Sequence, residues 1–125
     1  MQFDDFIQRV QEQTGLDARE DAERITRAVL ETLGERLERK VRNGVVSQLP
    51  NELKDYLLAR AAPRLDPYPL EEFYNRVGAR AGLTYQAAAE QARQVFVVLQ
   101  EAIQEGETRQ ILESLPGEYA ELFPK

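Results

Sequence analysis

Two arginines and two glutamates recur at matching places in the chain and could form specific ionic contacts. Arg9 and Arg76 each follow a phenylalanine by three residues, and Glu52 and Glu118 each follow a Leu-Pro pair at the same distance. A guanidinium group presents a rigid fork of donors that suits a carboxylate. We predict that the two arginines pair with the two glutamates, or with carbonyl groups at helix ends, and thereby fasten helix to helix. Two alternatives remain, namely that these residues are simply solvated or that the arginine pair binds a ligand.

Residue types that usually carry out catalysis are scarce. The 125 residues include no His and no Cys, which excludes an imidazole base, a thiolate nucleophile and the usual ligands of zinc. An enzyme would have to use a desolvated carboxylate or a tyrosine in a cleft, for example Tyr74 or Tyr119. We therefore expect no enzymatic activity and no cofactor or metal site.

The charge balance limits the classes of partner. The net charge is −6 and the pI is about 4.8, which argues against a general affinity for nucleic acid or for an anionic membrane. No apolar run approaches the roughly 18 residues that a membrane span needs, and the first residues lack the basic segment of a signal peptide. We expect a cytoplasmic protein without nucleic-acid or membrane partners.

Helical periodicity dominates the elements that must position these residues. Phe3, Phe6 and Val10 form the apolar stripe of a first short helix, which we expect Gly15 to end in the left-handed conformation. Asp17 is predicted to cap a long helix that continues as far as Lys40. No alternating pattern typical of strands competes with this reading, so the sequence predicts an all-α fold.

The same order of predicted helices occurs twice in the sequence. The first helix returns around Phe73 with Gly82 at its end, and Thr84 is predicted to cap a second long helix. The offset between the copies is 67 residues in the first helix and 66 afterwards. We predict a single helical domain, a bundle of two pseudo-symmetric repeats of about 66 residues: repeat one over 1–61, a proline-rich linker over 62–69 and repeat two over 70–125.

The order of these motifs resembles the bacterial domain-of-unknown-function family 2267. The resemblance rests on Phe-x-x-Arg-Val, Gly-Leu, a long helix and Leu-Pro-x-Glu, each used twice, and on the closing Glu-Tyr-Ala-Glu-Leu-Phe. It covers essentially the whole chain. The first copy departs where Lys40-Val41 stands in place of Gly106-Glu107. The resemblance implies a compact all-helical protein and carries over no catalytic residues.

The two long helices differ in one informative way. The second carries Val97 and Val98 where the first carries Glu31 and Thr32, so the second helix is apolar around its circumference. Such a helix is normally enclosed. It is therefore either central to the fold or covered by a partner at these two valines, and we favour the central position.

These features lead to a choice between two functions. We expect a non-catalytic protein-interaction or structural module, monomeric or weakly dimeric, that binds an unknown protein or a second copy of itself. The alternative is a small-molecule-binding protein that holds an apolar or anionic ligand between the repeats, where Arg9 and Arg76 would converge.

Overall fold

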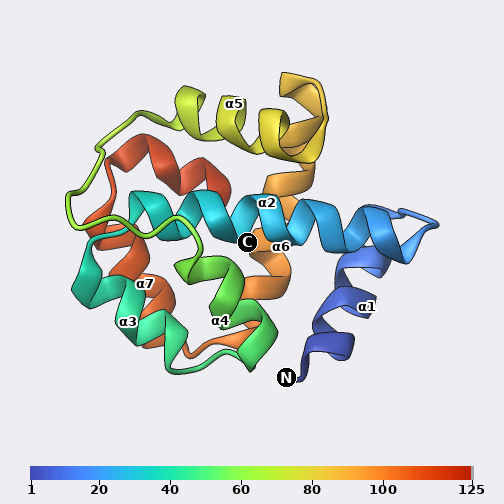
Figure 1. Ribbon diagram of the computed structural model, residues 1–125, viewed down its shortest axis with the longest axis horizontal. Coiled ribbons are helices and arrows are strands. Elements are labelled where there is room, and N and C mark those ends of the chain that lie inside the picture. The colour runs from blue at the N-terminus through green and yellow to red at the C-terminus, as the bar shows by residue number, and fades with distance from the viewer. Residues whose placement is uncertain (125) are drawn as a thin grey trace.

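The computed structural model describes residues 1–124, and all regular structure in this range is helical (Figure 1). Lys125, the last residue of the expected second repeat, lies outside the described residues. The elements, in chain order, are α1 (Phe3–Thr14), α2 (Arg19–Arg36), α3 (Arg39–Val46), α4 (Asn51–Leu58), α5 (Leu70–Ala81), α6 (Tyr85–Ala102), α7 (Glu105–Ser114) and the 3₁₀ helix η1 (Gly117–Leu122).

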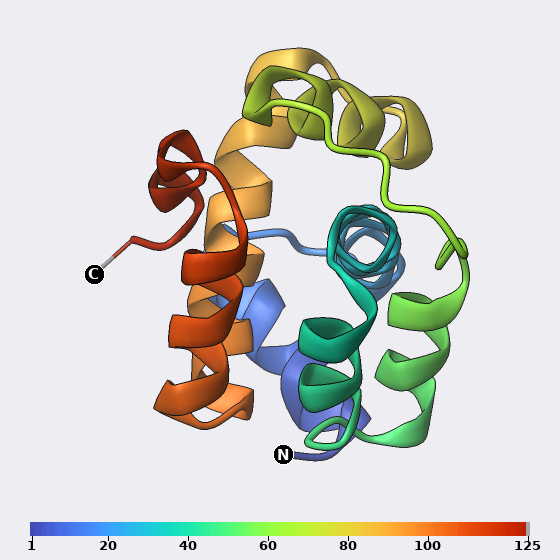
Figure 2. The same cartoon turned by 90° about the vertical axis from the view of Figure 1, so that its left-hand side faces the viewer.

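The two longest helices, α2 and α6, lie at the centre of the bundle. Figure 2 shows α2 nearly end-on, with α5 above it and α4 beside it. The helix α6 contacts α1, α2, α5 and η1. Fully buried side chains of both helices, such as Leu30, Leu33, Phe96 and Leu99, belong to one hydrophobic core. The central position that we favoured for α6 is the one that the structure shows.

The two halves of the chain interlock through their first helices. The helix α1 packs against α6 as well as against α2, and α5 packs against α2 as well as against α6. The helices α3 and α7 also contact each other. In both halves a helix of 12 residues is followed by one of 18 residues. Each half therefore covers the long helix of the other with its own first helix.

Helix ends follow local chemistry at several predicted places. Gly15 and Gly82 end α1 and α5 with φ values of 74° and 70°, a conformation that only glycine adopts without strain. The hydroxyl of Thr84 accepts a hydrogen bond from the backbone N–H of Ala87 at 3.2 Å and caps α6. The prediction that Asp17 caps α2 is wrong, because the N-cap is Ala18 and no side-chain cap bond forms there.

The end of α2 also differs from the expected end at Lys40, and two other helices, α3 and η1, have distinctive local features. The helix α2 ends at Arg36, and the extended Leu37 separates it from α3. Gly44 does not interrupt the chain but lies inside α3, where the carboxylate of Glu107 covers the place of its missing side chain. The last element is a 3₁₀ helix rather than an α-helix.

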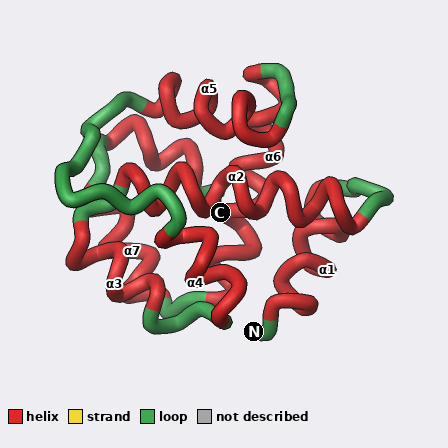
Figure 3. The backbone as a smooth tube through the Cα atoms, in the orientation of Figure 1, coloured by secondary structure: helices red, strands yellow, loops and turns green. Residues whose placement is uncertain are grey.

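The segment between α4 and α5 is the longest stretch without helix, over residues 59–69 (Figure 3). Most of it is exposed, as expected for a linker, but Tyr68 is only 5% exposed. A tyrosine thus anchors the linker in the core. Within residues 1–124, no helix combines the length and the apolar character required to cross a lipid bilayer.

Candidate functional site

The two recurring arginines are engaged in reciprocal contacts between the halves. Arg9 on α1 donates from Nε and Nη2 to the carboxylate of Glu101 on α6, at 2.9 and 2.7 Å. Arg76 on α5 donates from Nη1 to Glu35 on α2 at 2.9 Å. Since Glu35 and Glu101 stand at matching positions of the two copies, each half binds the long helix of the other through the same pair of residue types.

The predicted partners of these arginines are therefore wrong. Glu52 is exposed in the first turn of α4. Glu118, in η1, accepts a hydrogen bond from the backbone N–H of Leu70 at 3.2 Å. A carboxylate at that position stabilises the start of α5, where backbone N–H groups lack helical partners. The Leu-Pro-x-Glu motif thus supports helix ends, and the arginines find carboxylates on the helices against which they pack.

The second of these contacts is the more elaborate. Glu35 also accepts hydrogen bonds from Arg80, at 3.1 and 3.2 Å, and from the hydroxyl of Tyr68 at 2.9 Å. Burial on its own would raise the pKa of Glu35, but the donors on Arg80, Arg76 and Tyr68 outweigh burial and lower it below 4.5. The guanidinium of Arg76 also lies 3.9 Å from the centre of the Tyr68 ring, within the range of a cation–π contact. Glu35 is thus held ionised at the junction of α2, α5 and the linker.

Tyr68 fixes the position of η1 relative to α5. Its carbonyl oxygen accepts hydrogen bonds from the Tyr119 hydroxyl at 2.7 Å and from Nε of Arg36 at 2.9 Å. Both donors are buried, with Tyr119 fully enclosed. Burial is the largest cause of the raised pKa of Tyr119, so that its phenol stays protonated and serves as a donor. This network places the carboxylates of η1 opposite the first turn of α5.

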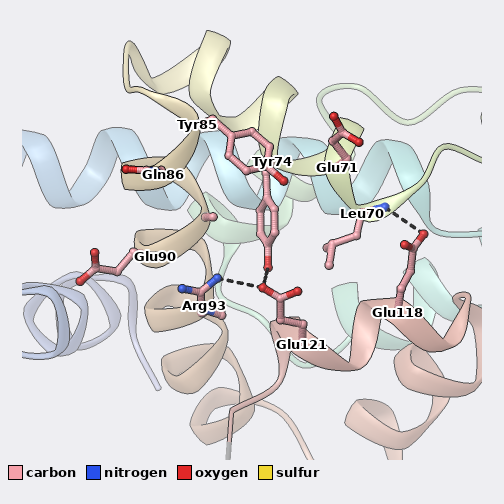
Figure 4. Close-up of a pocket in the computed structure, with 10 residues that line it drawn as sticks. Leu70, Glu71, Tyr74, Tyr85, Gln86, Glu90, Arg93, Glu118 and Glu121 are labelled. Atoms are coloured by element: carbon pink, nitrogen blue, oxygen red, sulfur yellow. Dashed lines mark hydrogen bonds and ion pairs between the residues drawn. The ribbon is translucent and has the colours of Figure 1, made fainter.

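A hollow of about 520 Å³ lies between the start of α5, the first turns of α6 and η1. Figure 4 shows Tyr74 and Tyr85 side by side at one wall, with Glu121 and Arg93 below them and Glu71 and Glu118 near the start of α5. Residues of only the second half line it: Leu70, Glu71, Tyr74, Tyr85, Gln86, Ala89, Glu90, Arg93, Glu118 and Glu121. We call this hollow the tyrosine pocket.

Contacts within the tyrosine pocket converge on one carboxylate. Glu121 accepts a hydrogen bond from the hydroxyl of Tyr74 at 3.3 Å and from Nη1 of Arg93 at 3.1 Å. Burial is the main cause that raises the pKa of Tyr74 to about 12, and this favours its neutral form at physiological pH. The ring of Tyr85 meets that of Tyr74 edge to face, with centroids 5.7 Å apart, and is 43% exposed.

A second hollow, of about 350 Å³, adjoins the first along α6. It is lined by Gln13, Glu90, Arg93, Gln94, Val97 and Pro124. Glu90 and Arg93 line both hollows, so the two hollows are neighbours along α6, and we call them together the α6 groove. Its floor is the stripe Gln86, Glu90, Arg93 and Val97, whose spacings of three and four residues place them on one face of the helix.

The two valines proposed as an interface have different surroundings. Val98 is fully buried within the chain, so the alternative that a partner covers it is wrong. Val97 is partly exposed and lines the α6 groove. A helix surrounded by four neighbours still leaves one stripe free, and Val97 lies on that stripe.

A further hollow lies between the halves but is small. It measures about 280 Å³ and is lined by residues of α3, α7 and the turn before α3: Glu38, Val41, Gln110, Glu113 and Ser114. Neither Arg9 nor Arg76 lines it, and both guanidinium groups are bound to carboxylates. The two arginines are thus engaged with carboxylates of the long helices and not with this hollow.

Sequence reasoning missed the tyrosine pocket, although a signal was present. At the first position of each long helix the copies differ, with Arg19 in the first and Tyr85 in the second. An exposed aromatic at the start of a helix in place of a charged residue marks a local change of surface chemistry. The pocket also depends on η1, whose placement comes from the buried Tyr68–Tyr119 contact and has no local signature.

Comparison with known proteins defines the family. None of the curated proteins matches the chain. Among residues 1–124, no group of three or more acidic side chains is arranged to hold a metal ion. A family model described as "Uncharacterized conserved protein (DUF2267)" matches residues 3–122, in agreement with the resemblance drawn from the repeated motifs. The chain belongs to the DUF2267 family of uncharacterised conserved proteins.

Proposed function

We propose that this chain is a non-catalytic protein-interaction module whose recognition surface is the α6 groove. One observation carries the proposal: two adjoining hollows share Glu90 and Arg93 as lining residues, and the second is also lined by the partly exposed Val97. Positions 86 to 97 extend over about 16 Å of helix axis. An extended peptide of about five residues has that length.

The chemistry of the groove suits a peptide better than a catalytic role. The floor carries three polar side chains and the apolar Val97 at one end, and recognition surfaces combine polar and apolar groups in this way. Tyr74, the potential acid or base, has its pKa raised to about 12, mainly by burial, so little phenolate forms near neutral pH. Tyr119, the other tyrosine considered, is enclosed in the core and donates to a backbone carbonyl.

A random library of 12-residue peptides, panned against the intact chain, tests this proposal. Binding of the selected peptides is then measured by fluorescence anisotropy to the wild type, to Val97→Gln and to Leu58→Gln. Leu58 is also an exposed apolar residue, at 43%, but it lies on α4 outside the groove and serves as the matched control. We expect Val97→Gln to weaken binding about tenfold, the loss of about 1.4 kcal/mol at an interface contact, and Leu58→Gln to leave it unchanged. Equal affinities for all three proteins, or the absence of selected peptides, would overturn the proposal.

The volume of the tyrosine pocket supports a second candidate. A hollow of about 520 Å³ falls in the range of roughly 300–1,000 Å³ that is usual for small-molecule sites. A small-molecule-binding protein would use this pocket alone, in the second half of the chain. Native mass spectrometry of the purified wild type and of Val97→Gln distinguishes the two candidates. A compound that both proteins retain equally favours the small-molecule site.

A further inference from the structure

The tyrosine pocket carries an excess of negative charge. Four carboxylates line it, those of Glu71, Glu90, Glu118 and Glu121, against the single guanidinium of Arg93. Arg93 is bound to one of the four, at 3.1 Å from Glu121. The other three line the hollow from α5, α6 and η1, and Glu118 among them accepts the hydrogen bond from the Leu70 N–H (Figure 4). The pocket therefore has an electrostatic preference for a cation.

The aromatic wall favours the same kind of occupant. The ring of Tyr85 is half-exposed beside these carboxylates, and the faces of tyrosine rings attract cations. The pKa of Tyr85 is raised first by burial and then by the negative charges of Glu71 and Glu121. Both the ring and the field acting on its hydroxyl thus indicate a site for positive charge.

The first half of the chain holds an arginine at the corresponding helix start. At the position that matches Tyr85 it carries Arg19, which forms ion pairs with Asp4 and with Glu23, the latter at 2.9 Å. The guanidinium of Arg19 also lies 6.0 Å from the centre of the Phe3 ring. At the start of α2 an arginine is thus held by two carboxylates and an aromatic ring.

The second half keeps only part of this set. Asp4 corresponds to Glu71 and Arg19 corresponds to Tyr85, whereas Glu23 corresponds to Ala89 and Phe3 to Leu70. One carboxylate of the set is therefore retained, and the ring of Tyr85 stands in place of the arginine. A basic side chain from outside would meet Glu71 and this ring, together with the other carboxylates of the pocket.

We propose that the tyrosine pocket receives a basic side chain, arginine in preference to lysine, from the peptide that lies in the α6 groove. The proposal rests on the proposed function and names the residue that determines specificity. The guanidinium group packs against the ring of Tyr85 and is bound by carboxylates of the rim. The peptide then continues along Glu90 and Arg93 towards Val97.

The first experiment uses capped single residues, so that it does not depend on finding a partner. N-acetyl-arginine-N-methylamide, its lysine counterpart and the neutral isostere citrulline are titrated into the ¹⁵N-labelled full chain and followed by NMR. We expect arginine, and more weakly lysine, to shift resonances at the start of α5, in the first turns of α6 and in η1. Citrulline should leave them in place. Equal shifts with citrulline, or shifts elsewhere only, would overturn the cationic preference.

Two variants and a matched control locate the effect. Glu90→Gln removes an exposed charge, and Glu118→Gln keeps an oxygen that can accept the Leu70 N–H. Glu52→Gln is the control, because Glu52 stands at the matching position of the first half, outside the pocket. Each pocket variant should weaken arginine binding about two- to fivefold, as expected for loss of one exposed charge contact. The control should bind as the wild type, and equal losses in all three would overturn the assignment.

The two proposals fail in different ways. If library peptides bind at Val97 but contain no basic residue and respond to neither Glu90→Gln nor Glu118→Gln, the cation site is refuted and the interaction module stands. If capped arginine binds in the pocket but no library peptide binds the groove, the interaction module is refuted. The occupant of the pocket is then a small cationic molecule.

Discussion

At the scale of single residues, the reciprocal arginine contacts have unequal environments. Arg9 and Glu101 are about one-third exposed, at 34% and 38% of the side chain, whereas Arg76 and Glu35 are 26% and 17% exposed. Exposed ion pairs contribute little because water screens them. Glu35 also accepts hydrogen bonds from three residues, so its removal leaves several donors without their partner.

We therefore expect Glu35→Gln to destabilise the protein more than Glu101→Gln does. The loss should be about 1–3 kcal/mol for Glu35→Gln, since hydrogen bonds to a charged group are broken. Glu101→Gln should cost less than about 1 kcal/mol. Urea denaturation followed by circular dichroism measures both free energies of unfolding. The expectation is wrong if the two variants lose the same stability.

The lowered pKa of Glu35 also predicts how stability depends on pH. A carboxylate whose pKa lies below its unfolded value of about 4.3 stabilises the folded state at higher pH. This contribution should be lost progressively as the pH falls from about 5 through the folded-state pKa, because protonation breaks the contacts with Arg80 and Arg76. Thermal melting between pH 7 and pH 3 should therefore show a smaller drop in Tm for Glu35→Gln than for the wild type. A drop of the same size in both proteins would contradict the role of Glu35.

The sequence indicated the two arginines of these contacts but not the glutamates with which they pair. Arg9, Arg76, Glu35 and Glu101 all recur between the copies, and recurrence alone does not tell whether contacts form within a copy or between copies. The partners are 92 and 41 residues apart along the chain. Such pairing depends on how the long helices cross, which local periodicity does not contain.

At the scale of elements, the close approach of α4 to α2 depends on one glycine. A Cβ atom at Gly34 would overlap the backbone carbonyl of Leu57. That carbonyl belongs to α4 and cannot move away as the tip of a side chain would. The matching position of α6 is Gln100, and η1 takes the place of a fourth α-helix there. The first half thus has a glycine where its last helix, α4, approaches α2, and the second half has Gln100 at the matching position and ends in the 3₁₀ helix η1.

We expect Gly34→Ala to destabilise the chain by about 1–3 kcal/mol, because overpacking outweighs the gain in helix propensity. Gly106→Ala in α7 is the matched control, since a Cβ there meets no atom within 4 Å. The control should be neutral or stabilise by up to about 1 kcal/mol. Differential scanning calorimetry of both variants measures the changes, and equal effects would contradict the clash at α4.

Helix type was predictable, whereas breaks between helices were less so. The helices α1 and α5 end at Gly15 and Gly82, which have positive φ values. Glycine readily adopts this conformation, so the sequence alone indicates these two helix ends. Gly44 carries the same residue type but lies within α3, because the chain continues helically and Glu107 packs over the vacant side-chain position. The break at Leu37 has no glycine or proline, so tertiary packing determines it.

At the scale of the whole molecule, the fold depends on contacts between halves rather than on the covalent linker. The first helix of each half covers the long helix of the other, so a separated half would expose both its long helix and its first helix. Tyr68 holds the C-terminal end of the linker in the core, while Arg64 and its neighbours are exposed. A cut before Tyr68 therefore removes no buried contact.

We expect the chain to remain folded after a single cut at Arg64. A tobacco etch virus protease site inserted after this residue would allow the cut to be made at will. The two fragments should co-elute in native size-exclusion chromatography and should separate only in denaturant, because apolar faces of both halves form one core. Each fragment expressed alone should lack cooperative unfolding, since its long helix has lost the first helix that covers it. Separation of the cut fragments under native conditions, or a cooperative melt of either fragment, would show instead that each half folds by itself and that the interlocking helices contribute little to stability.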